Sequence, residues 1–241
     1  MPRGYTPEDK IEFIKVIHNH ALSVSMESGF PLEFILAQAA YETGWGEHVI
    51  PGSNNLFNIK ADPSWKGPKK MSTTTEYVGI GDDAAPIRVH DKFRAYGSYK
   101  ESMYDWLDFL RSNPRYHGIG VKSNGERYID IFDPVIKNDP EMLAYALWHD
   151  GFATNPRYAG DLIKMMKGPT LQKALKKIND DEPPSPKPSS RGSRSGAPAR
   201  LSGHFQGSGH NGETLRRDDS DYKLVWRIEE DGATRGYFIS E

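Results

Sequence analysis

The sequence predicts an α+β fold, in which a mostly helical part carries one small β-hairpin. Three observations lead to this class. Apolar residues recur at helical spacing in several segments between Thr6 and about Lys177. Residues 72–80 and 85–95 are instead β-branched and alternate between apolar and polar, as strands do. After Asn179 the composition changes to Pro, Ser, Gly and Arg, so we expect the folded domain to end there.

The first helix is expected between Thr6 and Gly29. Thr6-Pro7-Glu8-Asp9 supplies a hydroxyl cap, a proline in the first turn and two acids that face the positive end of the helix dipole. The apolar stripe of this helix consists of Ile11, Ile14, Ile17, Ala21 and Leu22.

A second helix is expected from Pro31 to Thr43, and Gly44 follows as its end signal. Residues 44–70 are rich in Gly, Asn, Pro and Trp, which is typical of loops. The two strand-like runs come next and are expected to pair across residues 79–85 as a hairpin.

Three later helices are marked by start and stop residues. Residues 98–101 form a capping box that opens a helix to about Arg111. Asp-Pro and Asn-Pro pairs open helices over about 139–151 and 155–168, and each ends at a glycine. We expect residues 173–178 to be a short continuation of the last helix.

The predicted domain organisation has three parts. Residues 1–179 form the folded domain, residues 180–220 a disordered linker, and residues 221–241 a small hairpin-like segment around Asp231-Gly232. The stretch from Lys187 to Arg217 has a net charge of +5, so we expect it to contact anionic envelope surfaces.

Composition narrows the functional classes. The chain has 241 residues, 27% of them charged, and a net charge of −2, which does not indicate nucleic-acid binding. Cysteine is absent, which excludes disulfides and thiolate chemistry. No apolar run approaches the roughly 20 residues that span a bilayer, and no metal-ligand spacing appears among the eight histidines, so we expect no cofactor.

Glu42 is the first candidate for catalysis. It lies in the last turn of an apolar helix and is followed by Gly44-Trp45-Gly46. The negative end of the helix and an aromatic wall both raise the pKa of a carboxyl group, as a general acid near neutral pH requires. Position alone favours a solvated glutamate at a helix end; the small flanking residues weaken that interpretation, because they suit a cleft.

Other candidates follow further along the chain. The amides and aromatic rings of residues 54–60 suit sugars, although spacing alone favours a turn role for Asn54 and Asn55. Glu76 lies in a threonine-rich strand, and glycoside hydrolysis commonly uses two carboxylates; a surface glutamate is the alternative. Tyr158 belongs to a tetrapeptide, Asn-Pro-Arg-Tyr, that also occurs at 113–116 and that could serve only as a turn signal.

Five motifs together resemble a known family. The sequence is similar to the peptidoglycan β-N-acetylglucosaminidases of glycoside hydrolase family 73, which includes the hydrolase domain of the flagellar rod-cap protein. The resemblance covers roughly residues 6–167. The motifs, in order, are Glu-Thr-Gly-Trp-Gly at 42–46, Asn-Leu-Phe-Asn-Ile-Lys at 55–60, Thr-Thr-Glu-Tyr at 74–77, Phe-Arg-Ala-Tyr at 93–96 and Asn-Pro-Arg-Tyr-Ala at 155–159.

This resemblance implies a lysozyme-like fold, with a helical lobe and a small β-hairpin lobe over a cleft that binds the glycan strands of peptidoglycan. It implies that Glu42 is the general acid, Glu76 the second carboxylate and Tyr158 an active-site tyrosine. The family pattern has glycine where this sequence has Asn58. The residues expected to bind substrate are Trp45, Asn55, Phe57, Lys60, Trp65 and Tyr77.

Three questions stay open at this stage. A lytic transglycosylase, or a non-catalytic wall-binding or assembly module, is the alternative function. The second carboxylate or the substrate's own acetamido group could complete the reaction. Because no secretory signal is recognised at the start, we expect synthesis in the cytoplasm and action on the cell wall, in phage-type lysis or as a wall-targeted effector.

Overall fold

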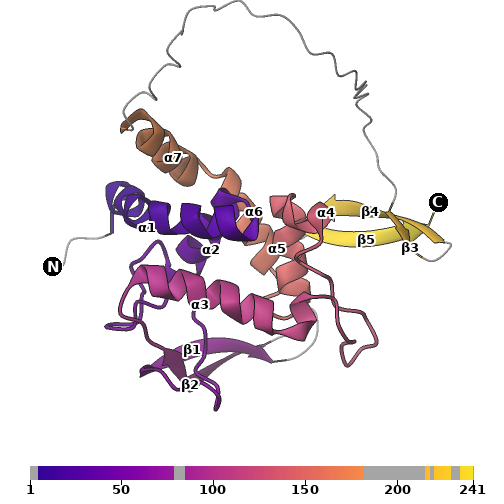
Figure 1. The fold of residues 1–241 in the computed structure, drawn as a ribbon, viewed down its shortest axis with the longest axis horizontal. Helices are drawn as coiled ribbons and strands as arrows, with labels where there is room; N and C mark the ends of the chain where they lie inside the picture. The colour runs from indigo at the N-terminus through magenta and orange to yellow at the C-terminus, as the bar shows by residue number, and fades with distance from the viewer. Residues whose placement is uncertain (1–4, 79–84, 182–214, 218–219, 229–233, 241) are drawn as a thin grey trace, which may run out of the picture. The chain divides into compact units, whose positions relative to one another are not determined.

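The computed structural model describes residues 5–78, 85–181, 215–217, 220–228 and 234–240. The chain divides into two compact units, residues 1–179 and 180–241. The first unit is mostly helical and carries a two-stranded sheet, which confirms the predicted α+β class (Figure 1).

The first two helices begin and end where the sequence predicts. In α1 (Pro7–Ser28) the Thr6 hydroxyl accepts a hydrogen bond from the Asp9 amide, and the Asp9 carboxylate accepts one from the Thr6 amide. Both α1 and α2 (Leu32–Thr43) end at a glycine with positive φ. This sharp end of α2 fixes the position of Glu42, one residue before the last helical residue.

The predicted hairpin is present as β1 (Lys69–Val78) and β2 (Ala85–Arg94), which are antiparallel. Lys69 pairs with Arg94, so β1 begins three residues before the predicted strand. The connection was expected across residues 79–85; residues 79–84 lie outside the described residues, and Ala85 is the first residue of β2.

The later helices are α3 (Tyr99–Ser112), α5 (Pro140–His149) and α6 (Tyr158–Lys167), and they agree with the predicted segments to within three residues. Two short helices, η2 (Pro114–Tyr116) and α4 (Pro134–Lys137), were not predicted. In the part of the chain that is described, no helix is long and apolar enough to cross a membrane.

The expectation that residues 173–178 continue the preceding helix is wrong. A separate helix, α7 (Pro169–Asp181), follows a break at Gly168, whose backbone is extended. Proline suits the first turn of a helix because that position needs no amide donor. Leu171 and Ala174 of α7 are buried in the core of the first unit.

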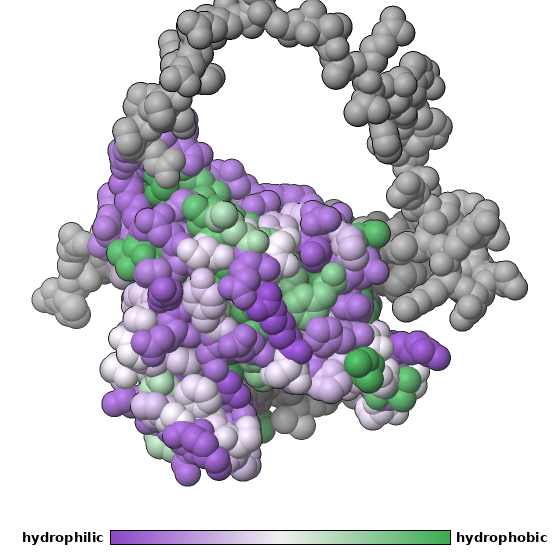
Figure 2. Space-filling view, viewed as in Figure 1, coloured by the Kyte–Doolittle hydropathy of each residue, from purple (hydrophilic) through white to green (hydrophobic). Residues whose placement is uncertain are grey.

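The core lies among α1, α2, α3, α5 and α6, and the hairpin lies beside this helical part (Figure 1). On the face shown in Figure 2, hydrophobic residues form only small, separate patches on a mostly hydrophilic surface. The largest fully buried side chains include Trp106, Tyr116, Tyr158, Phe30, Phe34 and Phe57.

The loop between α2 and β1 is held in place by Asn55, which is fully buried. Its amide nitrogen donates to the carbonyls of Ile59 and Arg94, at 3.0 and 2.9 Å. Its amide oxygen accepts from the backbone amides of Phe57 and Ile59. One side chain therefore closes the loop and ties it to β2.

The second unit contains an antiparallel sheet in the order β3-β4-β5, formed by β3 (Leu215–Arg217), β4 (Ser220–Ile228) and β5 (Thr234–Ser240). β3 falls within the range expected to be linker. Most of that linker, residues 182–214, and the Asp231-Gly232 turn lie outside the described residues.

We expect Asn55→Ala to lower the free energy of unfolding by on the order of 2 kcal/mol or more, because it leaves buried carbonyl and amide groups without partners. Urea titration followed by circular dichroism measures this loss. Asn179→Ala, at an exposed position of α7, is the control and should change stability by less than about 0.5 kcal/mol. Equal effects of the two substitutions would contradict the role assigned to Asn55.

Candidate active site

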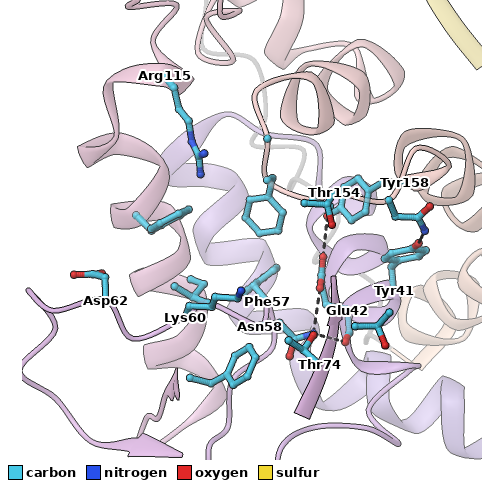
Figure 3. A pocket seen from close by; sticks show the side chains of 18 residues that line it. Tyr41, Glu42, Phe57, Asn58, Lys60, Asp62, Thr74, Arg115, Thr154 and Tyr158 are labelled. Atoms are coloured by element: carbon cyan, nitrogen blue, oxygen red, sulfur yellow. Dashed lines mark hydrogen bonds between the residues drawn. The ribbon is translucent and has the colours of Figure 1, made fainter. Parts of the chain in front are cut away.

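A pocket of about 530 Å³ lies where the helical lobe meets the hairpin (Figure 3). α2, the loop after it, both strands of the hairpin, η2 and the segment before α6 all contribute to its wall. Its polar and charged lining includes Tyr41, Glu42, Asn58, Lys60, Asp62, Arg115, Asn155 and Tyr158.

Both carboxylate oxygens of Glu42 accept hydrogen bonds. The Tyr158 hydroxyl donates to Oε1 at 3.0 Å, and the Asn58 amide donates to Oε2 at 3.1 Å. The same amide nitrogen donates to the Glu42 backbone carbonyl at 2.7 Å. The side chain and the end of α2 are therefore fixed together.

Burial raises the pKa of Glu42 from 4.5 to about 7, while the hydrogen bonds from Asn58 and Tyr158 lower it. The two donors stabilise the ionised form, and loss of water around the carboxyl group opposes them. Because loss of water has the larger effect, this group exchanges a proton near neutral pH.

A second set of contacts holds Tyr158 in place. The Gln38 amide donates to its hydroxyl at 3.0 Å, and its ring meets the ring of Tyr41 edge-on at 5.1 Å. The hydroxyl of Tyr41 accepts a hydrogen bond from Asn155 at 3.1 Å. Burial also raises the pKa of Tyr158 well above its usual value, so its hydroxyl stays protonated and acts as a donor.

Asn58 has a left-handed backbone, with φ of 51°. Asparagine is among the few residues that adopt this conformation readily, so it can replace the glycine of the family pattern. The replacement adds an amide group that glycine lacks, and that amide contacts Glu42.

Two of the residues expected to bind substrate line the pocket. The ring of Phe57 stacks on Trp106 at 4.7 Å, which fixes it in the pocket wall. Lys60 also lines the pocket, and its ammonium group pairs with Asp91 at 3.0 Å.

Three others lie outside the pocket lining. Trp45 has a left-handed backbone with a φ of 65°, and the Lys10 ammonium lies 5.8 Å from the centre of its ring. The aromatic residue that contacts Glu42 is Tyr158. Asn55 is buried in the loop. Trp65 packs under the guanidinium of Arg94 at 4.6 Å and away from the pocket.

Glu76 and Tyr77 are described only in their backbone. They lie in β1, opposite Ile87 and Pro86 of β2. Their side chains are outside the described part of the structure.

Sequence reasoning did not single out Tyr41, Arg115 and Asn155 as site residues, although all three line the pocket. The repeated tetrapeptide was the available signal. Its first copy contributes Arg115 and its second contributes Asn155 and Tyr158 to the same pocket. Among the described residues, no group of three or more His, Asp or Glu side chains is placed to hold a metal ion.

Comparisons with known proteins agree with this geometry. Residues 18–171 match the family model "Glucosaminidase", described as mannosyl-glycoprotein endo-beta-N-acetylglucosaminidase. The peptidoglycan hydrolase FlgJ of Escherichia coli K12 is 36% identical over 175 residues, covering 69% of this chain and 50% of FlgJ. This chain thus spans about half the length of the curated relatives it matches.

Solved structures give the same result. A peptidoglycan hydrolase mutant from Sphingomonas sp. A1 is 30% identical, with a TM-score of 0.58 over 69% of this chain and 99% of that one. The glycoside hydrolase domain of Salmonella typhimurium FlgJ is 32% identical, with a TM-score of 0.50 over 71% and 93% of the two chains. These matches confirm the expected lysozyme-like fold, and the chain belongs to the glucosaminidase family.

Proposed function

We propose that this protein hydrolyses the glycan backbone of peptidoglycan at the β-1,4 bond that follows N-acetylglucosamine, with Glu42 as the general acid. The observation that carries the proposal is a carboxyl group with a pKa of about 7, held by two donors in a pocket between two lobes. The names of the relatives, which are peptidoglycan hydrolases, support the substrate.

In the proposed reaction, protonated Glu42 donates its proton to the glycosidic oxygen as the bond between that oxygen and the sugar carbon breaks. The leaving sugar departs as an alcohol, and Glu42 becomes a carboxylate. Asn58 and Tyr158 already donate to its two oxygens, so the new negative charge forms where donors are in place. A pKa near the working pH keeps much of Glu42 protonated and still lets it release the proton to the leaving group.

Glu76 is proposed as the second carboxylate. Its support is the family resemblance and its position on β1, directly after Thr74 and Thr75, which both line the pocket. In the proposed reaction Glu76 activates water or assists attack by the substrate's acetamido group.

The proposed place of action is the bacterial cell wall, as the relatives' names suggest. The positive segment from Lys187 to Arg217 would support attachment to anionic envelope surfaces, an attraction that salt screens.

We expect Glu42→Gln to reduce the rate of glycan cleavage by about 10²–10⁴-fold, the usual contribution of a general acid. Glutamine keeps the shape of the side chain but donates no proton to a leaving group. Initial rates on soluble peptidoglycan fragments measure the loss, and thermal melts check the fold. Glu47→Gln, an exposed residue nearby, is the matched control, and activity near that of this control would reject the assignment.

The products should carry N-acetylglucosamine at their new reducing ends, because cleavage follows that sugar. Borohydride reduction and mass spectrometry of the fragments identify the end sugar. Reduced muramic acid would contradict the proposed bond, and anhydro-muramic ends would indicate a lytic transglycosylase.

Asn58→Gly should move the alkaline limb of the kcat/KM profile to higher pH. Glycine accepts the positive φ but removes a donor that favours ionised Glu42, so the pKa of Glu42 rises and the acid stays protonated to higher pH. The expected shift is up to about one pH unit, which corresponds to roughly 1.4 kcal/mol.

Asn54→Gly is the control for this profile. Asn54 has the same φ of 51° but donates to the Tyr96 carbonyl, away from Glu42. The control should keep the wild-type pH profile. A shift toward lower pH in Asn58→Gly would show that the amide does not act on Glu42 as proposed.

A further inference from the structure

Arg115 is a cationic side chain in the pocket that the proposed cleavage step does not use. It comes from η2, and Figure 3 shows it pointing into the pocket across from Glu42 and Tyr158. A charge on this wall would face a bound glycan away from the bond that breaks.

The guanidinium of Arg115 is held in place by its neighbour. Its Nη2 donates to the Tyr116 hydroxyl at 2.8 Å, and its central carbon lies 4.7 Å from the centre of the Tyr116 ring. Tyr116 is fully buried, so it is a fixed support. A guanidinium that is already oriented loses less freedom when it binds a ligand.

Within the described residues, no carboxylate lies within 4 Å of this guanidinium, and Nε is buried without a hydrogen-bond partner. Lys60, the other cationic residue of the pocket lining, differs in this respect, because it pairs with Asp91. Nε is shielded from the pocket, so a ligand would bind the outer nitrogens of Arg115, whose charge has no carboxylate partner among the described residues.

Gly151 is a second residue of the pocket wall next to Arg115. Gly151 lines the pocket, and a Cβ at this position would lie 3.5 Å from Nη1 of Arg115. The glycine has a φ of 81°, which side chains rarely adopt. Gly151 therefore lies beside Nη1 of Arg115 in the pocket wall.

We propose that Arg115 binds a carboxylate of the substrate and so selects acidic peptidoglycan over neutral polymers of N-acetylglucosamine. The inference rests on the proposed function. The planar guanidinium matches a carboxylate with two parallel hydrogen bonds. In peptidoglycan the carboxylate can come from the lactyl group of muramic acid, where the stem peptide is missing, or from the stem peptide itself.

Binding to three soluble tetrasaccharides tests the proposal. They are chitotetraose, which has no carboxylate, a peptide-free peptidoglycan tetrasaccharide with lactyl carboxylates, and the same sugar with stem peptides. Calorimetry on Glu42→Gln protein gives the dissociation constants without cleavage. Adding Arg115→Gln should weaken binding of at least one acidic ligand by about tenfold or more and change that of chitotetraose by less than about twofold.

Arg157→Gln is the matched control, because Arg157 is the exposed arginine of the second tetrapeptide copy and lies outside the pocket lining. It should leave all three constants unchanged. Thermal melts of each variant show whether a loss of binding comes from a loss of stability through the missing Tyr116 contact. Arg115→Lys should restore only part of the affinity that Arg115→Gln loses.

Weaker binding of the peptide-free ligand assigns the lactyl carboxylate, and weaker binding of the peptide-bearing ligand alone assigns the stem peptide. Equal weakening for all three ligands, or no weakening, overturns the proposal while the proposed function stands. If the parent Glu42→Gln protein binds none of the three, the proposed function fails and this inference fails with it.

Discussion

The site depends on the burial of one carboxyl group, that of Glu42, between two hydrogen-bond donors. Burial raises its pKa, and the donors from Asn58 and Tyr158 limit that rise, so the group has a pKa of about 7. The three residues come from α2, the loop after it and the start of α6. Any change that displaces one of these segments changes both the position and the protonation of the acid.

This arrangement reduces stability at neutral pH. The pKa of Glu42 is raised from 4.5 to about 7 in the folded state, so between these values the folded protein holds a proton that the unfolded chain has released. The stabilisation from this group is fully present below pH 4.5 and is lost as the pH rises through about 7. The buried Gln38 oxygen without a partner is a further cost at the same site.

Contacts that fix the loops around the pocket offset this loss of stability. Asn55 closes the loop that presents Asn58, and Phe57 in that loop stacks on the buried Trp106. These side chains act on the position of the site without facing a ligand. The family motif from Asn55 to Lys60 thus combines residues of the scaffold with residues of the pocket.

The sequence by itself determined the class of fold, the ends of the first helices and the family, because capping residues, periodicity and ordered motifs are local. It also marked Glu42 and Tyr158. Only the tertiary structure decided that Trp45, Asn55 and Trp65 lie outside the pocket lining, and that Arg115 lies in it. Burial and hydrogen-bond partners join residues distant in the chain, such as Glu42 and Tyr158, and no local pattern contains that information.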